Sequence, residues 1–497
     1  MELGPAAPVP PIPYPDPGTA TARLEVTPVA VPDEVLQQLR SSCAEVVTEA
    51  AERAEAGRDW WPIAMTWALE GQAPALASAV CRPSTAGEVA AVVAICNQAR
   101  IPVTAAGGRS GVLGGSVPLH GGVVMDLCGL SGIREVDTTS MVLDVAAGTF
   151  GDHLEAELRR DHHVTVGHWP QSMSLATVGG WLACRGAGQL STRYGKIEDI
   201  VVGMDIVLAD GRQIRTGGVP RQAVGPDLNQ LFVGSEGTLG IITSARLRLH
   251  PTPVADRRSA WGFPSFEAGL DAMRHTLQRG ATPAVLRLYD AVESERNYGT
   301  DGTRCVLLSL DEGEPSLVAT TIGILDDEAG RAGAERLDNE LVGRWLEHRN
   351  DVSALQELIS GGLVVDTMEI SAPWTSLPGI HAATIEAIGA VEGTLAVSAH
   401  HSHSYIDGGC LYFTFAGKVA AEARDHYHSS VWDAGVAAVL ARGGSLSHHH
   451  GVGLHRSKYM ADALGNAFDV LVALKAALDP NGILNPGKLG LPTPFAP

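Results

Sequence analysis

The stretch Gly107-Gly108-Arg109-Ser110-Gly111-Val112-Leu113-Gly114-Gly115 follows an apolar run over 101–105. We predict a strand that leads into a glycine loop. The five glycines of this loop free the backbone to adopt positive φ angles and to bring N–H groups close to phosphate oxygens. A Rossmann loop would open a helix, whereas Pro118 and a second apolar run over 123–127 come next. The pattern favours a nucleotide pyrophosphate bound between two strands, with a ligand-free glycine hairpin as the alternative.

Two further glycine-rich stretches lie in the same part of the chain. Residues 170–180 are small, carry several hydroxyl groups and end in Gly179-Gly180, and residues 234–240 precede an apolar run over 241–243. Hydroxyl groups and backbone amides can donate to the oxygens of a ligand. We expect none of the three stretches to open a clear helix, and each alone is explained by a turn. Together, within 76–250, they predict a dinucleotide held by backbone amides.

Length and composition limit the classes of function. A chain of 497 residues predicts two or three domains. The net charge of −20 argues against nucleic acid or an anionic membrane as the main partner, although composition leaves peripheral membrane contact open. The seven cysteines are scattered without a Cys-x-x-Cys pair, and we see neither a signal peptide nor an apolar run of about 20 residues. We therefore expect a cytoplasmic protein.

Proline positions and hydrophobic periodicity divide the chain into five parts and predict an α+β protein. Residues 1–32, which hold seven prolines between positions 5 and 17, are expected to form a disordered, Pro-rich tail. An N-terminal helical segment over 33–75 should begin with one amphipathic helix over 33–56. The remaining parts are a nucleotide-binding region over 76–252, a second α+β region over 253–445 and a C-terminal segment over 446–497.

Apolar patterns also place individual elements. The strands over 76–83 and 101–105 should enclose a helix over 85–96 in a β-α-β unit. Other strands are expected over 123–127, 141–146, 241–243, 305–310 and 411–415. Other helices are expected over 151–160, 267–279, 328–346, 418–441 and around 471–475.

The 18 histidines are spread unevenly, and six of them form two clusters. His400, His401 and His403 lie near Tyr405 and Tyr412, and the triplet His448-His449-His450 precedes a glycine. Histidine transfers protons near neutral pH, and a tyrosine beside it can relay a proton. Catalysis or substrate binding, structural histidines and metal ligation are the alternatives. We predict no metal site, because consecutive side chains in a strand point in different directions and no zinc motif is evident. A serine hydrolase is disfavoured because the chain lacks a Gly-x-Ser-x-Gly elbow.

Several motifs resemble the FAD-linked oxidases with the vanillyl-alcohol-oxidase, or PCMH, type of FAD domain. Within that superfamily the resemblance is to the alkyldihydroxyacetonephosphate synthases and their bacterial relatives. It extends over nearly all of the chain after residue 57. Besides the glycine-rich stretches, it is carried by the segments 57–62, 178–181, 194–199, 220–221, 225–228, 371–374, 411–413, 443–453 and 479–488.

The resemblance implies a two-subdomain PCMH-type FAD-binding domain over 76–252, an α+β cap domain over 253–445 and a C-terminal helical segment that returns to the FAD domain. By resemblance, Tyr412 is the proton donor and acceptor, His448, His449 and His450 line the reacting centre, and Arg221 supports the site. FAD would be bound by Ala106, Gly107, Gly108, Arg109, Ser110, Gly111, Val112, Gln171, Ser172, Ser174, Thr177, Gly179, Gly180, Arg185, Tyr194, Glu236, Gly237, Thr238, Gly240, Ile241 and Ile242.

The implied activity is the exchange of an acyl group for an alkyl group on a ketone phosphate, a reaction of ether-lipid synthesis on a small-molecule or lipid-like substrate. The runner-up is oxidation of a 2-hydroxy acid or alcohol, and a flavin-binding module without turnover is the third hypothesis. A homodimer is also implied. FAD should be non-covalent, because related proteins attach it to a histidine of the first loop and residues 107–116 contain none.

One position departs from the family. An arginine that binds the substrate phosphate is expected sixteen residues before Ser371, and counting without gaps places Leu355 there. Leucine cannot form the paired hydrogen bonds that a guanidinium gives to phosphate. Either Arg349 or Arg287 therefore substitutes, or the substrate lacks the phosphate.

Overall fold

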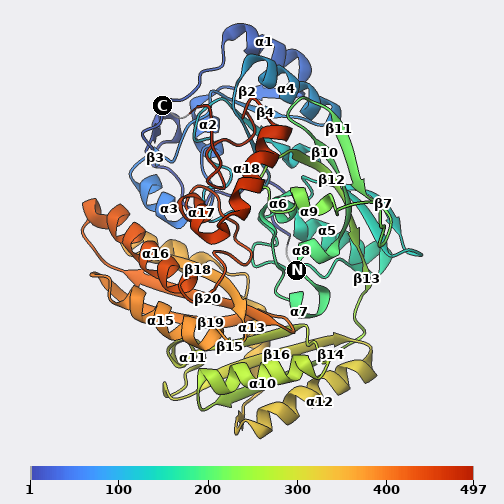
Figure 1. The fold of residues 1–497 in the computed structure, drawn as a ribbon, viewed down its shortest axis with the longest axis vertical. Helices are drawn as coiled ribbons and strands as arrows, with labels where there is room; N and C mark the ends of the chain where they lie inside the picture. The colour runs from blue at the N-terminus through green and yellow to red at the C-terminus, as the bar shows by residue number, and fades with distance from the viewer. Residues whose placement is uncertain (1–2, 496–497) are drawn as a thin grey trace.

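The computed structural model describes residues 3–495 and divides into two bodies of mixed α/β structure (Figure 1). The upper body in that view contains a four-stranded and a five-stranded sheet, and the lower body contains one seven-stranded sheet with long helices packed against it. The red C-terminal helix lies back on the upper body. Within the described residues, no helix combines the length and apolar character needed to cross a membrane. The predicted α+β class is confirmed.

The four-stranded sheet contains the predicted β-α-β unit. Its order is β2-β4-β6-β5, and the last three strands are parallel. The glycine loop joins β5 directly to β6, as predicted. The strands and adjoining helices are β2 (Glu45–Val47), β4 (Ala79–Arg82), β5 (Val103–Ala106), β6 (Val123–Asp126), α1 (Asp33–Ser42), α2 (Ala50–Ala56), α3 (Pro62–Leu69) and α4 (Ala86–Ala99).

The single helix predicted over 33–56 is wrong. Helix α1 ends at Ser42, and strand β2 separates it from α2. The β-branched pair Val46 and Val47 lies opposite Cys81 and Val80 of β4, so pairing with the sheet overrides the helical spacing of the apolar residues.

The five-stranded antiparallel sheet forms the second half of the upper body. Its strand order is β11-β10-β12-β8-β7. Its elements are β7 (Ile133–Asp137), β8 (Val142–Ala146), β10 (Val201–Val207), β11 (Gln213–Gly217) and β12 (Ile241–Arg248). The neighbouring short elements are α5 (Gly151–Glu157), β9 (Val164–Thr165), α6 (Val178–Cys184), α7 (Ser191–Tyr194), α8 (Ile197–Ile200), α9 (Asn229–Phe232) and β13 (His250–Pro251).

Helix α6 corrects a sequence expectation, because one of the three glycine-rich stretches does open a helix. The Thr177 side chain accepts a hydrogen bond from the backbone N–H of Gly180 (3.3 Å) and caps the helix. A Cβ atom on Gly179 would lie 2.9 Å from Ala147 Cβ. Gly179, one of the two glycines that suggested a loop, therefore allows close packing of a helix. The predicted helix over 151–160 is shorter, since α5 ends at Glu157 and a wider π-type turn follows.

The seven-stranded antiparallel sheet forms the lower body, with the order β17-β14-β16-β15-β19-β20-β18. Its strands are β14 (Ala255–Phe263), β15 (Val285–Tyr289), β16 (Cys305–Gly313), β17 (Glu335–Arg336), β18 (Val364–Pro373), β19 (Thr394–Ser404) and β20 (Gly408–Gly417). Its helices are α10 (Phe266–Gln278), α11 (Ala291–Tyr298), α12 (Pro315–Arg331), α13 (Glu340–His348), α14 (Ser353–Ser360), α15 (Leu377–Gly389) and α16 (Arg424–Leu440).

The helix predicted over 328–346 is two helices in the structure. Helix α12 ends at Arg331, the short strand β17 follows, and α13 starts at Glu340. Gly333 has φ +71°, a left-handed conformation that ends a helix readily. Strand β17 then pairs with β14 at the sheet edge.

Residues 3–32 are not the disordered tail that the prolines suggested. Ile12 and Tyr14 are buried, and the indole N–H of Trp60 donates to the carbonyl oxygen of Val9 (3.0 Å). The guanidinium of Arg58 lies over the Tyr14 ring at 3.8 Å. Farther along, β1 (Thr21–Ala22) pairs with β3 (Gln72–Ala73). Apolar and aromatic side chains between the prolines therefore fix this segment against the upper body.

The C-terminal segment returns to the glycine loop. After α17 (Met460–Leu464) and α18 (Ala467–Leu478), Leu484 forms a parallel bridge with Val103 of β5. The Asn485 side-chain amide donates to the carbonyl oxygens of Gly115 (3.0 Å) and Glu236 (2.6 Å). The end of the chain thus ties two of the three glycine-rich stretches together.

Candidate functional site

A cavity of about 990 Å³ is lined by residues of both bodies. All three glycine-rich stretches contribute to its lining, together with β15, β19, β20 and the loop after α16. A volume of this size accommodates a large organic ligand. We describe first the glycine-rich part of the lining and then the histidine-rich part.

The first two glycine-rich stretches lie in direct contact. A Cβ atom on Gly107 would lie 2.3 Å from Thr177 Oγ1, and one on Gly108 would lie 1.8 Å from the Leu175 carbonyl oxygen. Both glycines are therefore required by close packing of one stretch on the other. Among the described residues, the side chains of Ser110 and Ser172 have no protein hydrogen-bond partner although both line the cavity. These hydroxyl groups remain free to bind a ligand.

Tyr412 of β20 lies in the histidine-rich part of the cavity. Its hydroxyl group donates to Thr367 Oγ1 (3.0 Å), and its ring stacks on His400 with centroids 4.9 Å apart and an interplanar angle of 17°. The rings of His449 and His450 lie 6.2 and 5.4 Å from the Tyr412 ring. Burial raises the pKa of Tyr412 above its ordinary value, so its phenol is protonated at neutral pH and is a proton donor.

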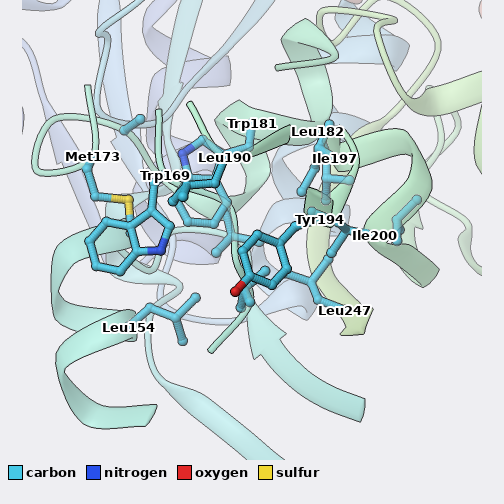
Figure 2. Close-up of a cluster of buried hydrophobic side chains, with 14 of the residues drawn as sticks. Leu154, Trp169, Met173, Trp181, Leu182, Leu190, Tyr194, Ile197, Ile200 and Leu247 are labelled. Atoms are coloured by element: carbon cyan, nitrogen blue, oxygen red, sulfur yellow. The ribbon is translucent and has the colours of Figure 1, made fainter. Parts of the chain in front are cut away.

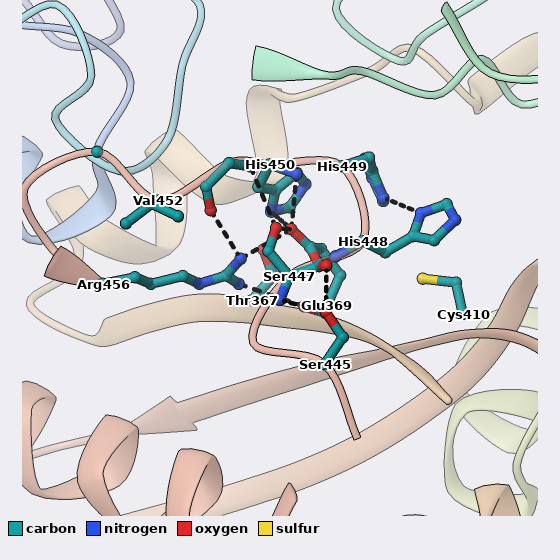
Figure 3. Close-up of polar contacts among 12 residues, drawn as sticks. Thr367, Glu369, Cys410, Ser445, Ser447, His448, His449, His450, Val452 and Arg456 are labelled. Carbon is teal, nitrogen blue, oxygen red and sulfur yellow. Dashed lines mark hydrogen bonds and ion pairs between the residues drawn. The ribbon is translucent and has the colours of Figure 1, made fainter. Parts of the chain in front are cut away.

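Glu369 of β18 fixes the loop that carries the histidine triplet (Figure 3). One of its carboxylate oxygens accepts from the backbone N–H of His448 (2.6 Å), and the other accepts from that of His450 (2.6 Å) and from the Ser447 hydroxyl (2.9 Å). Arg456 donates to the same carboxylate at 3.0 Å, and both side chains are fully buried. This network sets the direction of the histidine rings.

His449 and His450, which line the cavity, are neutral near pH 7. Burial lowers the pKa of His449 well below its ordinary value, and the neighbouring histidines add to the effect. Burial also lowers the pKa of His450, although the Glu369 carboxylate opposes this shift. A neutral imidazole has a free nitrogen lone pair, so His449 and His450 can accept a proton from a substrate.

Comparison with known proteins identifies the family. The model of the "FAD binding domain" matches residues 77–217, and that of the "FAD linked oxidases, C-terminal domain" matches residues 252–489. The "Uncharacterized FAD-linked oxidoreductase YgcU" of Escherichia coli (strain K12) is 32% identical over 430 residues, 83% of this chain and 88% of that protein. This chain belongs to the FAD-linked oxidase family. FAD is its cofactor.

Two further matches are to alkyldihydroxyacetonephosphate synthases. The Trypanosoma brucei brucei protein is 28% identical over 455 residues, which is 84% of this chain and 73% of that protein. A solved alkyldihydroxyacetonephosphate synthase structure superposes with a TM-score of 0.79 and 23% identity, covering 98% of this chain and 90% of that one. The second comparison concerns the fold alone.

Both the volume of the cavity and the residues that line it are compatible with bound FAD. Most of the residues expected to bind FAD line it, which are Ala106, Gly107, Gly108, Arg109, Ser110, Gly111, Val112, Gln171, Ser172, Thr177, Gly179, Gly180, Glu236, Gly237, Gly240, Ile241 and Ile242. In addition, Asp59 Oδ2 is a buried cavity atom without a hydrogen-bond partner in the described residues. Burial raises the pKa of Asp59 to about 7, so this carboxyl group can donate to as well as accept from a bound cofactor.

Four residues expected to bind FAD do not line the cavity. Tyr194 belongs to the hydrophobic core beside Leu190 and Ile197 (Figure 2), and its hydroxyl group donates to Glu312 (2.7 Å). Arg185 pairs with Glu198. The Thr238 hydroxyl donates to a local carbonyl oxygen, and Ser174 lies against Gly4 of the N-terminal segment. Their motifs are explained by packing and local hydrogen bonds.

Two residues expected to be catalytic also lie outside the lining. Arg221 is exposed in the loop between β11 and α9, where the structure does not bring it to the cavity. His448 is buried. Its Nε2 is hydrogen-bonded to Tyr405 Oη (2.8 Å), and its Nδ1 is hydrogen-bonded to His449 Nδ1 (2.9 Å). The structure places Tyr412, His449 and His450 at the cavity and gives His448 a supporting position.

We predicted no metal site because consecutive side chains of a strand point in different directions. The triplet lies in a loop, not a strand, and nitrogens of His403, His448 and His449 lie within 4.8 Å of one another. Two of these rings are hydrogen-bonded to each other, and His403 Nδ1 is bonded to the Ser191 hydroxyl group (2.7 Å). The loop therefore brings His448 and His449 close to His403 of β19, an arrangement that strand geometry does not predict.

The sequence assigned no cofactor role to Asp59 and no role at all to Trp345, which both line the cavity. Asp59 stands between Arg58 and Trp60 in the segment 57–62, and these neighbours give no signal that separates a cofactor contact from a packing role. Trp345 lies on a helix whose pattern is that of an ordinary amphipathic surface helix, which gives no signal of a site.

Proposed function

We propose that this protein is an FAD-dependent enzyme that exchanges an acyl for an alkyl group on a ketone phosphate, as the names of its alkyldihydroxyacetonephosphate synthase relatives suggest. The observation that carries the proposal is the position of Tyr412 between His400 and the rings of His449 and His450 at the cavity. Such a group of side chains can donate one proton and accept another. A protein that only stores a flavin has no need of it.

In this proposal each side chain has a defined task. A neutral His449 or His450 accepts a proton from the carbon next to the substrate carbonyl, and the Tyr412 hydroxyl donates a hydrogen bond to the substrate oxygen. FAD, when bound, supplies an electron-accepting ring next to that carbon. The carbon–oxygen bond to the acyl group breaks and a carbon–oxygen bond to the alcohol forms, so that a fatty acid leaves and the exchange is not a net oxidation.

Oxidation of a 2-hydroxy acid or alcohol is the second candidate. It is favoured by Leu355, which lines the cavity at the position where the resemblance places a phosphate-binding arginine. A substrate without a phosphate would not need that arginine. In this reaction FAD, when bound, would supply the two-electron acceptor, with oxygen or another carrier as the final oxidant, and the same histidines would accept the proton.

Turnover of the Tyr412→Phe variant tests the proposal. The purified holoprotein is given an acyl ketone phosphate and a fatty alcohol, and released fatty acid and ether product are measured. Loss of the phenol should lower turnover by about 10²- to 10⁴-fold while FAD stays bound. Tyr459→Phe is the matched control, because Tyr459 bonds to Asp433 away from the cavity. Unchanged turnover in Tyr412→Phe would contradict the role of Tyr412, and turnover of 2-hydroxy acids alone would select the second candidate.

A further inference from the structure

Basic side chains gather in one part of the cavity of this acidic protein. Arg287 on β15 and Arg349 just after α13 both line it, as do Arg344 and His348 of α13. Of the acidic residues in the lining, Glu293 is already engaged by His400 (3.1 Å) and by Arg296 (3.0 Å), and Asp351 accepts a hydrogen bond from the Ser353 backbone N–H (2.9 Å). The charge of this part of the cavity is therefore opposite to that of the chain as a whole.

Arg287 has only neutral partners among the described residues. It donates to the Tyr289 hydroxyl (3.0 Å) and to His400 Nε2 (2.7 Å). His400 Nδ1 faces the Glu293 carboxylate, which makes Nε2 the acceptor for Arg287. No carboxylate within the described residues forms an ion pair with Arg287, so its positive charge is not neutralised by direct contact.

Arg349 lies between two indole rings. Its guanidinium carbon is 5.6 Å from the Trp169 ring and 5.7 Å from the Trp345 ring, and the Arg287 guanidinium lies 5.5 Å from the same Trp345 ring. Within the described part of the chain, the Arg349 side chain has no hydrogen-bond or ion-pair partner. Burial lowers the pKa of Arg349; Glu312 opposes this shift, and the like charges of Arg159 and Arg287 add to it.

Two other arginines that are partly or fully shielded from solvent have carboxylate partners. The fully buried Arg456 contacts Glu369, and the half-buried Arg193 contacts Asp311. The half-buried Arg287 and Arg349 have no such contact within residues 3–495. A half-buried charge without such a partner carries part of the desolvation cost of a buried one, and a ligand of opposite charge offsets that cost. Aromatic faces hold a guanidinium flat and leave its edge free for the two parallel hydrogen bonds that an oxyanion accepts.

We propose that Arg287 and Arg349, with Trp345 between them, bind the terminal oxyanion of the substrate, a phosphate ester or a carboxylate. This inference rests on the proposed function for the reacting centre, and its binding residues differ from Tyr412, to which Arg287 is linked through His400. Arg287 and Arg349 would thus provide the anion site that Leu355 cannot provide at the position where the resemblance places an arginine. Two guanidiniums favour an anion with two charges over one with a single charge.

The test is equilibrium binding of small anions to the holoprotein, with the change in flavin absorbance as the readout. The probes are dihydroxyacetone phosphate, D-lactate and the neutral control glycerol. We expect saturable binding of an anion and none of glycerol at the same concentration. Arg349→Gln and Arg287→Gln should each weaken anion binding by about 10- to 100-fold. Arg257→Gln is the matched control, because Arg257 is exposed and lies outside the cavity lining.

Arg349→Lys keeps the positive charge and replaces Arg349→Gln in the binding test if Arg349→Gln fails to fold. It should bind anions more weakly than the wild type because it lacks the planar fork. Tighter binding of dihydroxyacetone phosphate identifies a phosphate-ester substrate, and tighter binding of D-lactate identifies a carboxylate. Anion binding that is unchanged in the arginine variants, or no stronger than glycerol binding in the wild type, overturns the anion site. Arginine-dependent anion binding without acyl exchange would contradict only the proposed function.

Discussion

Glu369 shows how one buried residue determines the geometry of the reacting centre. Burial alone would raise the pKa of this carboxyl group, but Arg456, His450 and two backbone N–H groups hold it below its ordinary value. The carboxylate is therefore charged at neutral pH and accepts hydrogen bonds from both ends of the histidine triplet. The chemistry assigned to His449 and His450 depends on this residue, although Glu369 does not line the cavity.

Glu369→Gln should lower both stability and turnover. The amide cannot neutralise Arg456, and breaking one side of a buried ion pair costs about 3–5 kcal/mol. Denaturant unfolding monitored by circular dichroism measures the free energy of unfolding, and turnover is measured on the folded fraction. Glu386→Gln is the control, since Glu386 is exposed on α15. A variant with the wild-type free energy of unfolding and wild-type turnover would show that Glu369 does not position the triplet.

The structural elements differ in how well the sequence predicted them. The strand, glycine loop and strand over 101–127 followed from local signals, because apolar runs and glycines act over a few residues. The splits at 43–49 and 332–339 could not be predicted, since apolar residues at mixed spacing fit a helix or a strand until the partner strand is known. The helix at 178–184 was missed because the glycine pair suggested a loop, whereas Gly179 serves packing on Ala147.

The first glycine loop also predicts how FAD is held. Residues 107–116 contain no histidine that could attach the flavin. Acid precipitation of the holoprotein should therefore release yellow flavin into the supernatant, as measured by its absorbance. Colour that stays with the pellet would show a covalent bond made by another residue.

The whole molecule assembles its cavity from distant parts of the chain. Tyr412, His449 and His450 lie in sequence motifs and line the cavity, whereas His448 of the same motif does not, and their catalytic roles stay predictions. Arg287 and Arg349 were only alternatives for one missing residue, and nothing in the sequence indicates that they share the ring of Trp345. Such a juxtaposition depends on the pairing of β15 within the seven-stranded sheet and on the position of α13, which no local pattern encodes.

Buried histidines should make the fold sensitive to acid. Burial lowers the pKa of His168 and His401 to about 3, below about 6.5 in an unfolded chain. Below pH 6.5 the unfolded state therefore binds protons that the folded state does not, so stability falls as the pH falls. The raised pKa values of four carboxyl groups act in the opposite direction, those of Asp59, Glu155, Glu236 and Asp311. More histidines have lowered pKa values, among them His403, His448, His449 and His455.

Thermal unfolding of the holoprotein should therefore have a lower midpoint at pH 5.5 than at pH 7.5. His401→Gln should reduce the pH dependence of the unfolding free energy by about one proton, or about 1.4 kcal/mol per pH unit below pH 6. His426→Gln is the control, because His426 is exposed. An equal pH dependence in wild type and His401→Gln would contradict a neutral, buried His401.

The most direct test of the account is the visible spectrum of the purified protein under anaerobic conditions, before and after addition of an acyl ketone phosphate or a 2-hydroxy acid. We predict a flavin band that bleaches with the acyl ketone phosphate while fatty acid is released. Bleaching by a 2-hydroxy acid alone would contradict acyl exchange and select the oxidation reaction. A flavin band that no member of either class alters would contradict a reacting centre built on Tyr412, His449 and His450.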